Sequence, residues 1–157
     1  MREKQFVLMC DCTCDSGIVF RVNGDLFVST FSGDFYKFQG SFLSELKDNI
    51  RLLFTRKKYL TEIITTPDRL TELRDFLSRA NITSCDEHEK NKSHLVFETE
   101  ADLEGVCFVT LICDMSWKEI LQGKRYRCHE LLLNRKETNR LLMKIDKCIA
   151  SATVSKI

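Results

Sequence analysis

The chain opens with apolar and polar positions in alternation, the period of β-strands that bury one face. On the first of these segments three cysteines occupy every second position, Cys10, Cys12 and Cys14, on the same face as Phe6 and Leu8. Four segments share the period and end at turn residues: 5–14, 17–23, 25–31 and 34–38. We therefore predict an opening set of antiparallel strands, with Asn23 and Gly24 forming a type I′ hairpin turn.

A helical period follows the opening strands. Apolar residues recur every three to four positions over 41–54, and again over 67–80, where Thr66 is a suitable N-cap and Pro67 fits the first turn. Between these two helices, residues 59–65 are rich in β-branched side chains, which favours a strand over the alternative of a continued helix.

The second half of the chain alternates in the same way between the two periods. Strands are predicted at 94–100, 105–114 and 124–133, a helical turn at 118–122, and a C-terminal helix at 134–152. Asn134 and Glu137 have the spacing of a capping box. Residues 83–93 carry almost no apolar side chain and predict a mobile loop. The expected fold is a single α+β domain over 1–157, with an antiparallel sheet or partly closed barrel, an inserted helical region and a C-terminal helix.

Composition narrows the functional classes. The 157 residues are 43% hydrophobic, enough for one core, and the net charge of +1 gives no overall attraction to nucleic acid or an anionic membrane. The sequence shows neither the apolar run of a signal peptide nor the length of a membrane span. We expect an intracellular protein, nuclear or cytoplasmic, that does not contact membranes.

Eight cysteines invite a metal or thiol hypothesis. Zinc could be held by Cys12, Cys14, Cys85 and His88, but cysteines two apart on a strand make a poor zinc knuckle. We therefore expect reduced, buried thiols and no cofactor. A zinc- or thiol-dependent enzyme, with Cys85 acting beside His88 or His94, is kept as a third hypothesis.

No other catalytic arrangement is evident in the sequence. The carboxylate pairs Asp11 with Asp15 and Glu98 with Glu100 fall on polar strand faces, and the six glycines form no phosphate-binding loop. The chain is therefore predicted not to be an enzyme.

Two basic clusters could contact phosphates. One contains Arg51, Arg56, Lys57 and Lys58 beside Tyr59, and the other lies within 124–140 beside Tyr126. The basic residues of the second cluster are Lys124, Arg125, Arg127, Arg135, Lys136 and Arg140. Nucleic-acid binding through 56–58 and 124–140 is the alternative function, weighed against an ordinary solvated charged face.

The C-terminal helix carries an apolar stripe that either packs on its own sheet or pairs with a partner helix. The stripe consists of Leu141, Leu142, Ile145, Cys148 and Ile149. Its apolar surface, and the absence of a converging polar site, lead us to predict a protein-interaction or assembly module that binds a protein partner, or a second copy of itself, through this helix.

The order of elements also resembles a known family. Residues 16–31, which form a strand, turn and strand before a helical insert, and 106–114 are similar to the head domains of the DNA end-joining scaffold superfamily. That superfamily includes XLF and PAXX and also groups the head of the centriolar cartwheel protein. The resemblance implies a non-enzymatic, dimeric scaffold whose head and stalk recruit partners, acting in DNA repair or another nuclear complex.

Overall fold

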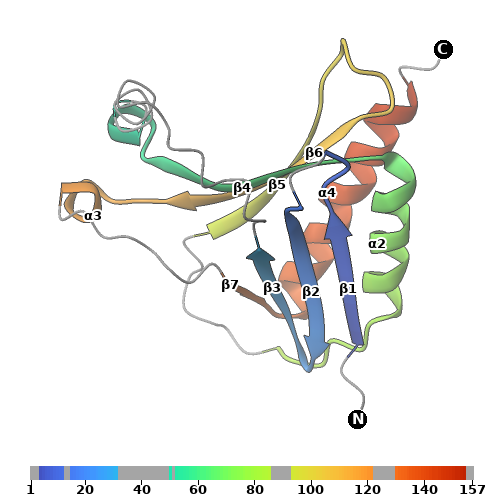
Figure 1. The fold of residues 1–157 in the computed structure, drawn as a ribbon. Helices are drawn as coiled ribbons and strands as arrows, with labels where there is room; N and C mark the ends of the chain where they lie inside the picture. Colours follow the sequence, from blue (N-terminus) through green and yellow to red (C-terminus); the bar gives the residue numbers. More distant parts are fainter. Residues whose placement is uncertain are drawn as a thin grey trace.

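The computed structural model describes residues 4–12, 15–31, 50, 52–85, 93–121 and 130–154. Its strands form two antiparallel sheets, one ordered β1-β2-β3-β7 and the other β4-β6-β5 (Figure 1). The strands are β1 (Lys4–Met9), β2 (Gly17–Asn23), β3 (Asp25–Phe31), β4 (Lys57–Thr65), β5 (Ser93–Thr99), β6 (Cys107–Asp114) and β7 (Glu130–Leu133). The helices are α2 (Pro67–Arg79), α3 (Trp117–Leu121) and α4 (Arg135–Val154). The predicted α+β class and antiparallel pairing are confirmed, and the described strands do not close into a barrel.

The β2–β3 hairpin forms where Asn23-Gly24 predicts it, but with a tighter turn than type I′. Asn23 pairs directly with Asp25, and Gly24 alone has a positive φ, +75°. The Gly24 carbonyl accepts hydrogen bonds from the backbone N–H groups of Thr83 and Ser84 at 2.9 and 3.2 Å. The turn therefore fixes the position of a segment that follows it by about 60 residues.

In the second sheet, β6 is the central strand, paired with β4 on one side and β5 on the other. Its residues from Val109 to Cys113 are all buried, so the strand predicted at 105–114 is covered on both faces. The pairing of β4 with β6 shifts register between Tyr59 and Thr61, the signature of a β-bulge.

One corner between the two sheets is closed by backbone contacts. After β1 ends, the N–H of Asp11 donates to the Ile64 carbonyl at 2.8 Å, and the Ile64 N–H donates to the Cys10 sulfur at 3.2 Å. These bonds connect β1 of one sheet to β4 of the other. The strands at the opposite ends of the two sheets, β7 and β5, are not paired with each other.

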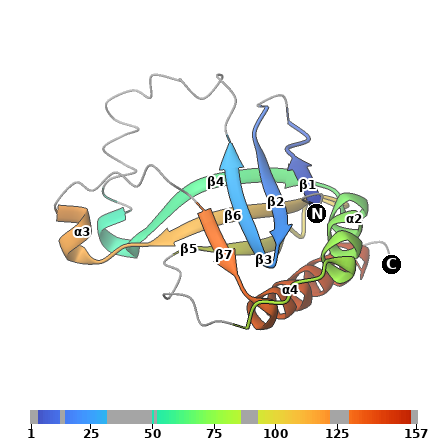
Figure 2. The ribbon, with the colours of Figure 1, turned by 90° about the horizontal axis from the view of Figure 1, so that it is seen from below.

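Two helices cover the sheets on the side of the core (Figure 2). Helix α2 begins at its predicted cap, where the Thr66 hydroxyl accepts from the Arg69 N–H at 3.4 Å. In α4 the predicted capping box is present: the Asn134 side chain accepts from the Glu137 N–H at 2.9 Å, and the Glu137 carboxylate accepts from the Asn134 N–H at 3.0 Å.

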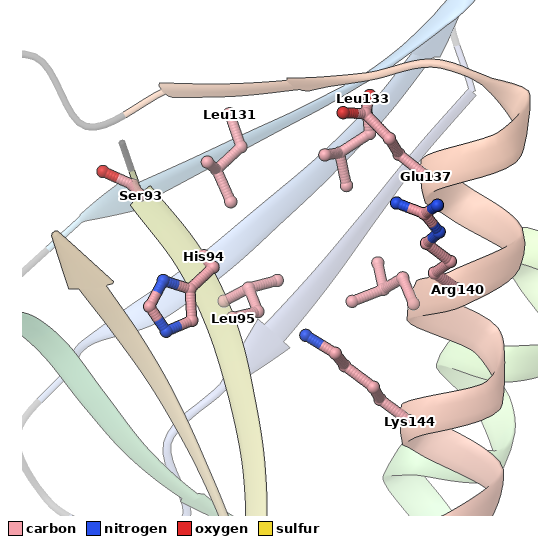
Figure 3. Close-up of a pocket in the computed structure, with 9 residues that line it drawn as sticks. Ser93, His94, Leu95, Leu131, Leu133, Glu137, Arg140 and Lys144 are labelled. Atoms are coloured by element: carbon pink, nitrogen blue, oxygen red, sulfur yellow. The ribbon is translucent and has the colours of Figure 1, made fainter. Parts of the chain in front are cut away.

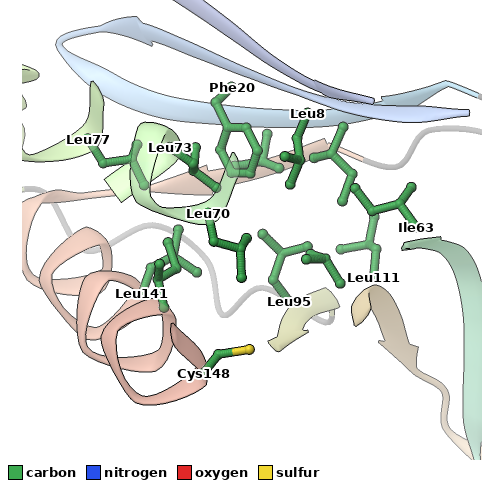
Figure 4. Close-up of a cluster of buried hydrophobic side chains, with 14 of the residues drawn as sticks. Leu8, Phe20, Ile63, Leu70, Leu73, Leu77, Leu95, Leu111, Leu141 and Cys148 are labelled. Carbon is green, nitrogen blue, oxygen red and sulfur yellow. The ribbon is translucent and has the colours of Figure 1, made fainter. Parts of the chain in front are cut away.

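The core fills the space between the sheets and these helices (Figure 4). Leu8 and Phe20 from the first sheet, Leu111 from the second and Leu70 from α2 are completely buried. Because α2 and α4 lie side by side, Arg74 of one also reaches Asp146 of the other, with 2.6 Å between nitrogen and oxygen.

The first strand departs from the prediction at its end. Pairing stops at Met9, opposite Gly17, and the Cys10 N–H turns to the Ser16 carbonyl at 2.8 Å. Cys10 is buried as expected, but Cys12 lies beyond the strand and is exposed. Cys12 is also disulfide-bonded, so the expectation of reduced thiols is wrong for this residue.

Other boundaries differ more modestly. The mobile loop predicted over 83–93 is wrong at both ends, because Thr83 and Ser84 are hydrogen-bonded to Gly24 and Ser93 begins β5. The described part of the predicted 41–54 helix is helical at 50 and 52–54. The strand predicted at 34–38, most of the 41–54 helix, and residues 86–92 and 124–129 lie outside the described residues.

Candidate binding groove

A cavity lies where β5 and β7, the end strands of the two sheets, come near each other without pairing. It has a volume of about 250 Å³ and lies between β5, β7 and the first half of α4 (Figure 3). Its lining residues are Ser93, His94, Leu95, Leu131, Leu133, Glu137, Arg140, Leu141 and Lys144. The end strands of both sheets thus border one cavity.

The floor of this cavity is apolar and its rim on α4 is cationic. Leu95, Leu131 and Leu141 are buried side chains from three different elements. Arg140 and Lys144 are exposed and project from α4 toward the cavity (Figure 3). Residues four apart lie one above the other on a helix, so these two cations form a row beside the buried stripe of α4.

A second cavity continues the first along the same strand. It has a volume of about 300 Å³ and is lined by Leu95, Val96, Phe97 and Thr99 of β5 and by Lys144, Lys147, Cys148 and Ser151 of α4. Leu95 and Lys144 line both cavities. We call the two cavities together the edge groove, because they follow β5, the end strand of its sheet, from Ser93 to Thr99.

The edge groove is locally basic in a nearly neutral chain. Arg140, Lys144 and Lys147 form no ion pair with a described residue. The carboxylate of Glu137 is already used by the Asn134 backbone N–H. His94 Nδ1 lies 3.5 Å from an Asp114 carboxylate oxygen, so its side chain is turned toward β6. The α4 side of the groove therefore carries three positive side chains and one carboxylate, that of Glu137, with no ion pair among them.

The thiol in the groove is not set up as a nucleophile. Cys148 is buried, and its hydrogen bond to Cys107, reinforced by burial, raises the pKa of the Cys148 thiol. A raised pKa keeps the side chain in the unreactive thiol form at neutral pH. The groove has the features of a binding surface, with no activated nucleophile among its described residues.

The partner-binding stripe predicted on the C-terminal helix is not a free surface. Leu141, Ile145 and Cys148 are buried in the core of the chain itself, and Leu142 and Ile149 pack against that core. The stripe therefore packs on its own sheets and on α2, one of the two alternatives, and partner binding through it stays a prediction. Leu141 and Cys148 are accessible only where they line the edge groove, and Leu142 and Ile149 are half-buried.

The predicted basic clusters are separated in space. Arg56 and Lys57 are exposed at the start of β4, at the end of the sheet remote from α4 (Figure 1). The side chain of Lys58 is not described. Three residues of the second cluster are described, Arg135, Lys136 and Arg140, and they lie on α4; of these three, Arg140 alone lines the groove.

The remaining candidate chemistry is not assembled in the described part of the chain. Cys12 is disulfide-bonded, Cys85 is an exposed free thiol, and Cys14 and His88 fall outside the described residues. No three potential metal ligands come together among the residues that the structure describes. Asp11, Asp15, Glu98 and Glu100 are exposed.

Sequence reasoning missed Lys144, Lys147 and the open edge of β5. A signal was available for the two lysines, because Arg140, Lys144 and Lys147 recur at the four- and three-residue spacing of the apolar stripe beside them. The open edge had no comparable signal, since strand order depends on pairing between distant segments.

Comparisons with models of known protein families, with curated proteins and with solved structures found no match. Within the described residues, no helix has both the length and the apolar character needed to cross a bilayer.

Proposed function

We propose that this chain is a non-enzymatic protein-interaction module that binds a segment of a partner protein in the edge groove. The observation that carries the proposal is the convergence of the end strands of both sheets and a row of unpaired cations on one leucine-floored cavity. Surfaces that combine an apolar centre with a charged rim are typical of protein-protein recognition.

The shape of the groove favours a peptide segment over a small molecule. Its two cavities, of about 250 and 300 Å³, follow one another along β5 instead of forming one enclosed pocket. The first cavity can accept a large apolar side chain, while the second cavity extends the contact along β5.

The lining favours protein over nucleic acid as the partner. Single-stranded nucleic acids are usually held by aromatic side chains on which bases stack. The first cavity contains no Phe, Tyr or Trp, and Phe97, which lines the second, packs against the core. A phosphate backbone would meet Arg140, Lys144 and Lys147 but would leave the apolar floor of the first cavity unused.

The experiment is selection of binders from a random peptide display library on the folded chain. Selected peptides would then be tested against Arg140→Glu/Lys144→Glu, which reverses two exposed charges in the groove. A matched control, Arg21→Glu/Arg79→Glu, reverses two exposed charges away from it. We expect the groove variant to lose binding by about tenfold or more while the control binds like the original chain.

Recovery of no binder would contradict the proposal. So would binders that retain full affinity for the groove variant, since their site would then lie elsewhere on the molecule. Circular dichroism of both variants checks that they are folded.

A further inference from the structure

We infer that the occupant of the edge groove is an extended acidic peptide segment that adds to β5 as a further strand. This inference rests on the proposed function, and it specifies both the chemistry of the partner and the way it binds. Its basis is the alignment of three features along one line: a strand edge, a row of cations and an apolar cavity.

The strand edge comes first. An end strand leaves the backbone N–H and C=O of every second residue without a partner in its sheet. For residues 93–97 of β5, no described backbone hydrogen bond other than those to β6 is present, whereas the Glu98 carbonyl accepts from the Cys148 thiol of α4 at 3.7 Å. A peptide in the groove can therefore satisfy these groups by strand pairing, a common mode of peptide recognition.

The row of cations runs in the same direction as the edge. Residues 93–95 line the first cavity together with 137–144 of α4, and residues 95–99 line the second together with 144–151. Strand and helix therefore advance side by side from Ser93 to Thr99 and from Glu137 to Ser151. A strand laid against residues 93–97 of β5 would pass Arg140 and Lys144 in turn, and the contact between Cys148 and Glu98 marks the end of the open edge.

The spacing of the cations fits acidic residues on one face of a strand. Arg140 and Lys144 are four residues apart, which corresponds to about 6 Å along a helix axis. Side chains on one face of a strand repeat about every 6.8 Å. Two acidic residues separated by one position can thus meet Arg140 and Lys144 together, and each pair would be a charge-assisted contact.

The apolar cavity determines where the third specified side chain of the peptide, an apolar one, would bind. It lies at the Ser93 end of the groove, where Leu131 and Leu133 of β7 contribute to its lining. A peptide that pairs antiparallel to β5 would reach this end with its C-terminal half. The expected recognition pattern is acidic-x-acidic-x-apolar, with the three specified side chains facing the groove.

The row of cations has a second explanation, protection of the strand edge, and the test separates it from peptide binding. Lysines near an open strand can simply prevent edge-to-edge aggregation. In that case the charges would repel other strands and no acidic peptide would bind. The two alternatives make opposite predictions for a peptide that matches the groove.

The test uses the full chain and a fluorescent peptide of sequence Thr-Glu-Thr-Glu-Thr-Leu-Thr with blocked ends. Fluorescence anisotropy would measure its affinity for the original chain, for Arg140→Glu/Lys144→Glu and for the control Arg21→Glu/Arg79→Glu. Lys147→Glu is a second groove variant. We expect saturable binding that falls about tenfold or more in the double groove variant and is unchanged in the control.

N-methylated peptides and hydrogen exchange test strand addition separately from the acidic contacts. Two analogues of the peptide carry N-methyl groups on alternate residues, one on the odd positions and the other on the even. Only one set of N–H groups faces β5, so one analogue should lose binding and the other should keep it. Hydrogen exchange should slow in β5 on binding, while β4 stays unchanged.

The outcomes distinguish the inference from the function on which it rests. If the peptide binds in the groove but neither N-methylated analogue is weakened, strand addition is wrong while the proposed function stands. If library peptides bind the groove and the acidic peptide does not, the acidic partner is wrong. If a DNA oligonucleotide binds in a groove-dependent way and no peptide does, both the inference and the proposed function are overturned.

Discussion

Gly24 is the residue on which the β2–β3 turn depends most directly. Its φ of +75° lies in the region that L-residues with a Cβ rarely adopt, although an added Cβ would meet no atom closer than 3.8 Å. Gly24→Ala should therefore lower the free energy of unfolding by about 1–2 kcal/mol through backbone strain alone. Gly24→Asn should cost less, because asparagine tolerates this conformation. Urea denaturation of both variants measures the difference, and equal losses would point to packing instead.

Cysteine reactivity should follow burial. Cys85 is an exposed free thiol, whereas Cys107, Cys113 and Cys148 are buried, and the pKa of the Cys148 thiol is raised by its hydrogen bond to Cys107. Iodoacetamide at pH 8 should label Cys85 first in the native protein. The buried thiols should be labelled only after unfolding, as peptide mass spectrometry would reveal. Early labelling of Cys148 would contradict its place in the core.

The start of α4 is the element boundary with the clearest hydrogen-bond arrangement. Asn134→Ala removes the side chain that caps the Glu137 N–H, and should lower the free energy of unfolding by about 1 kcal/mol. Lys136→Ala changes an exposed neighbour and should stay within about 0.5 kcal/mol of the original. Chemical denaturation of the two variants provides the comparison, and a neutral Asn134→Ala would indicate that the helix begins elsewhere.

The apolar stripe of α4 belongs to the core, and two single substitutions test this. Ile145 is completely buried, so Ile145→Ala should cost about 2–5 kcal/mol. Met143 is 64% exposed on the same helix, and Met143→Ala should change stability little. If Ile145→Ala were as mild as Met143→Ala, the stripe would be available to a partner, as first predicted from the sequence.

The elements that the sequence predicts well are those marked by local signals. Thr66-Pro67 marks the start of α2, Asn134 with Glu137 marks the start of α4, and Asn23-Gly24 places the first hairpin. What local periodicity could not settle is how the elements pack. The same stripe of leucines on α4 suits an interface or a core, and only its contacts with α2 and β5 decide that it is core.

The binding groove was less predictable for the same reason. Arg140 was a candidate because it is basic, but its neighbours in the groove come from β5 and β7, which the sequence does not connect to it. The order β4-β6-β5, which leaves β5 at an edge, is a property of the whole molecule.

At the scale of the whole molecule, protection from hydrogen exchange should be centred on β6. This strand pairs on both sides and is buried from Val109 to Cys113. Native-state hydrogen exchange should therefore find its amides among the slowest, and those of β5 faster because half of them lack a partner strand. Amides in β5 as slow as those in β6 would contradict an open edge.

The pairing of β3 with β7 has a consequence for how the chain is made. Leu26 pairs with Leu133, so the last strand of the first sheet is synthesised more than 100 residues after the strand it completes. At roughly 5–20 residues per second, the ribosome takes about 5–20 s to supply it. During that interval the β1-β2-β3 meander has an unpaired edge, and α4, which covers its core face, has not yet emerged. The nascent chain should therefore need chaperone protection most while residues 32–129 are being translated.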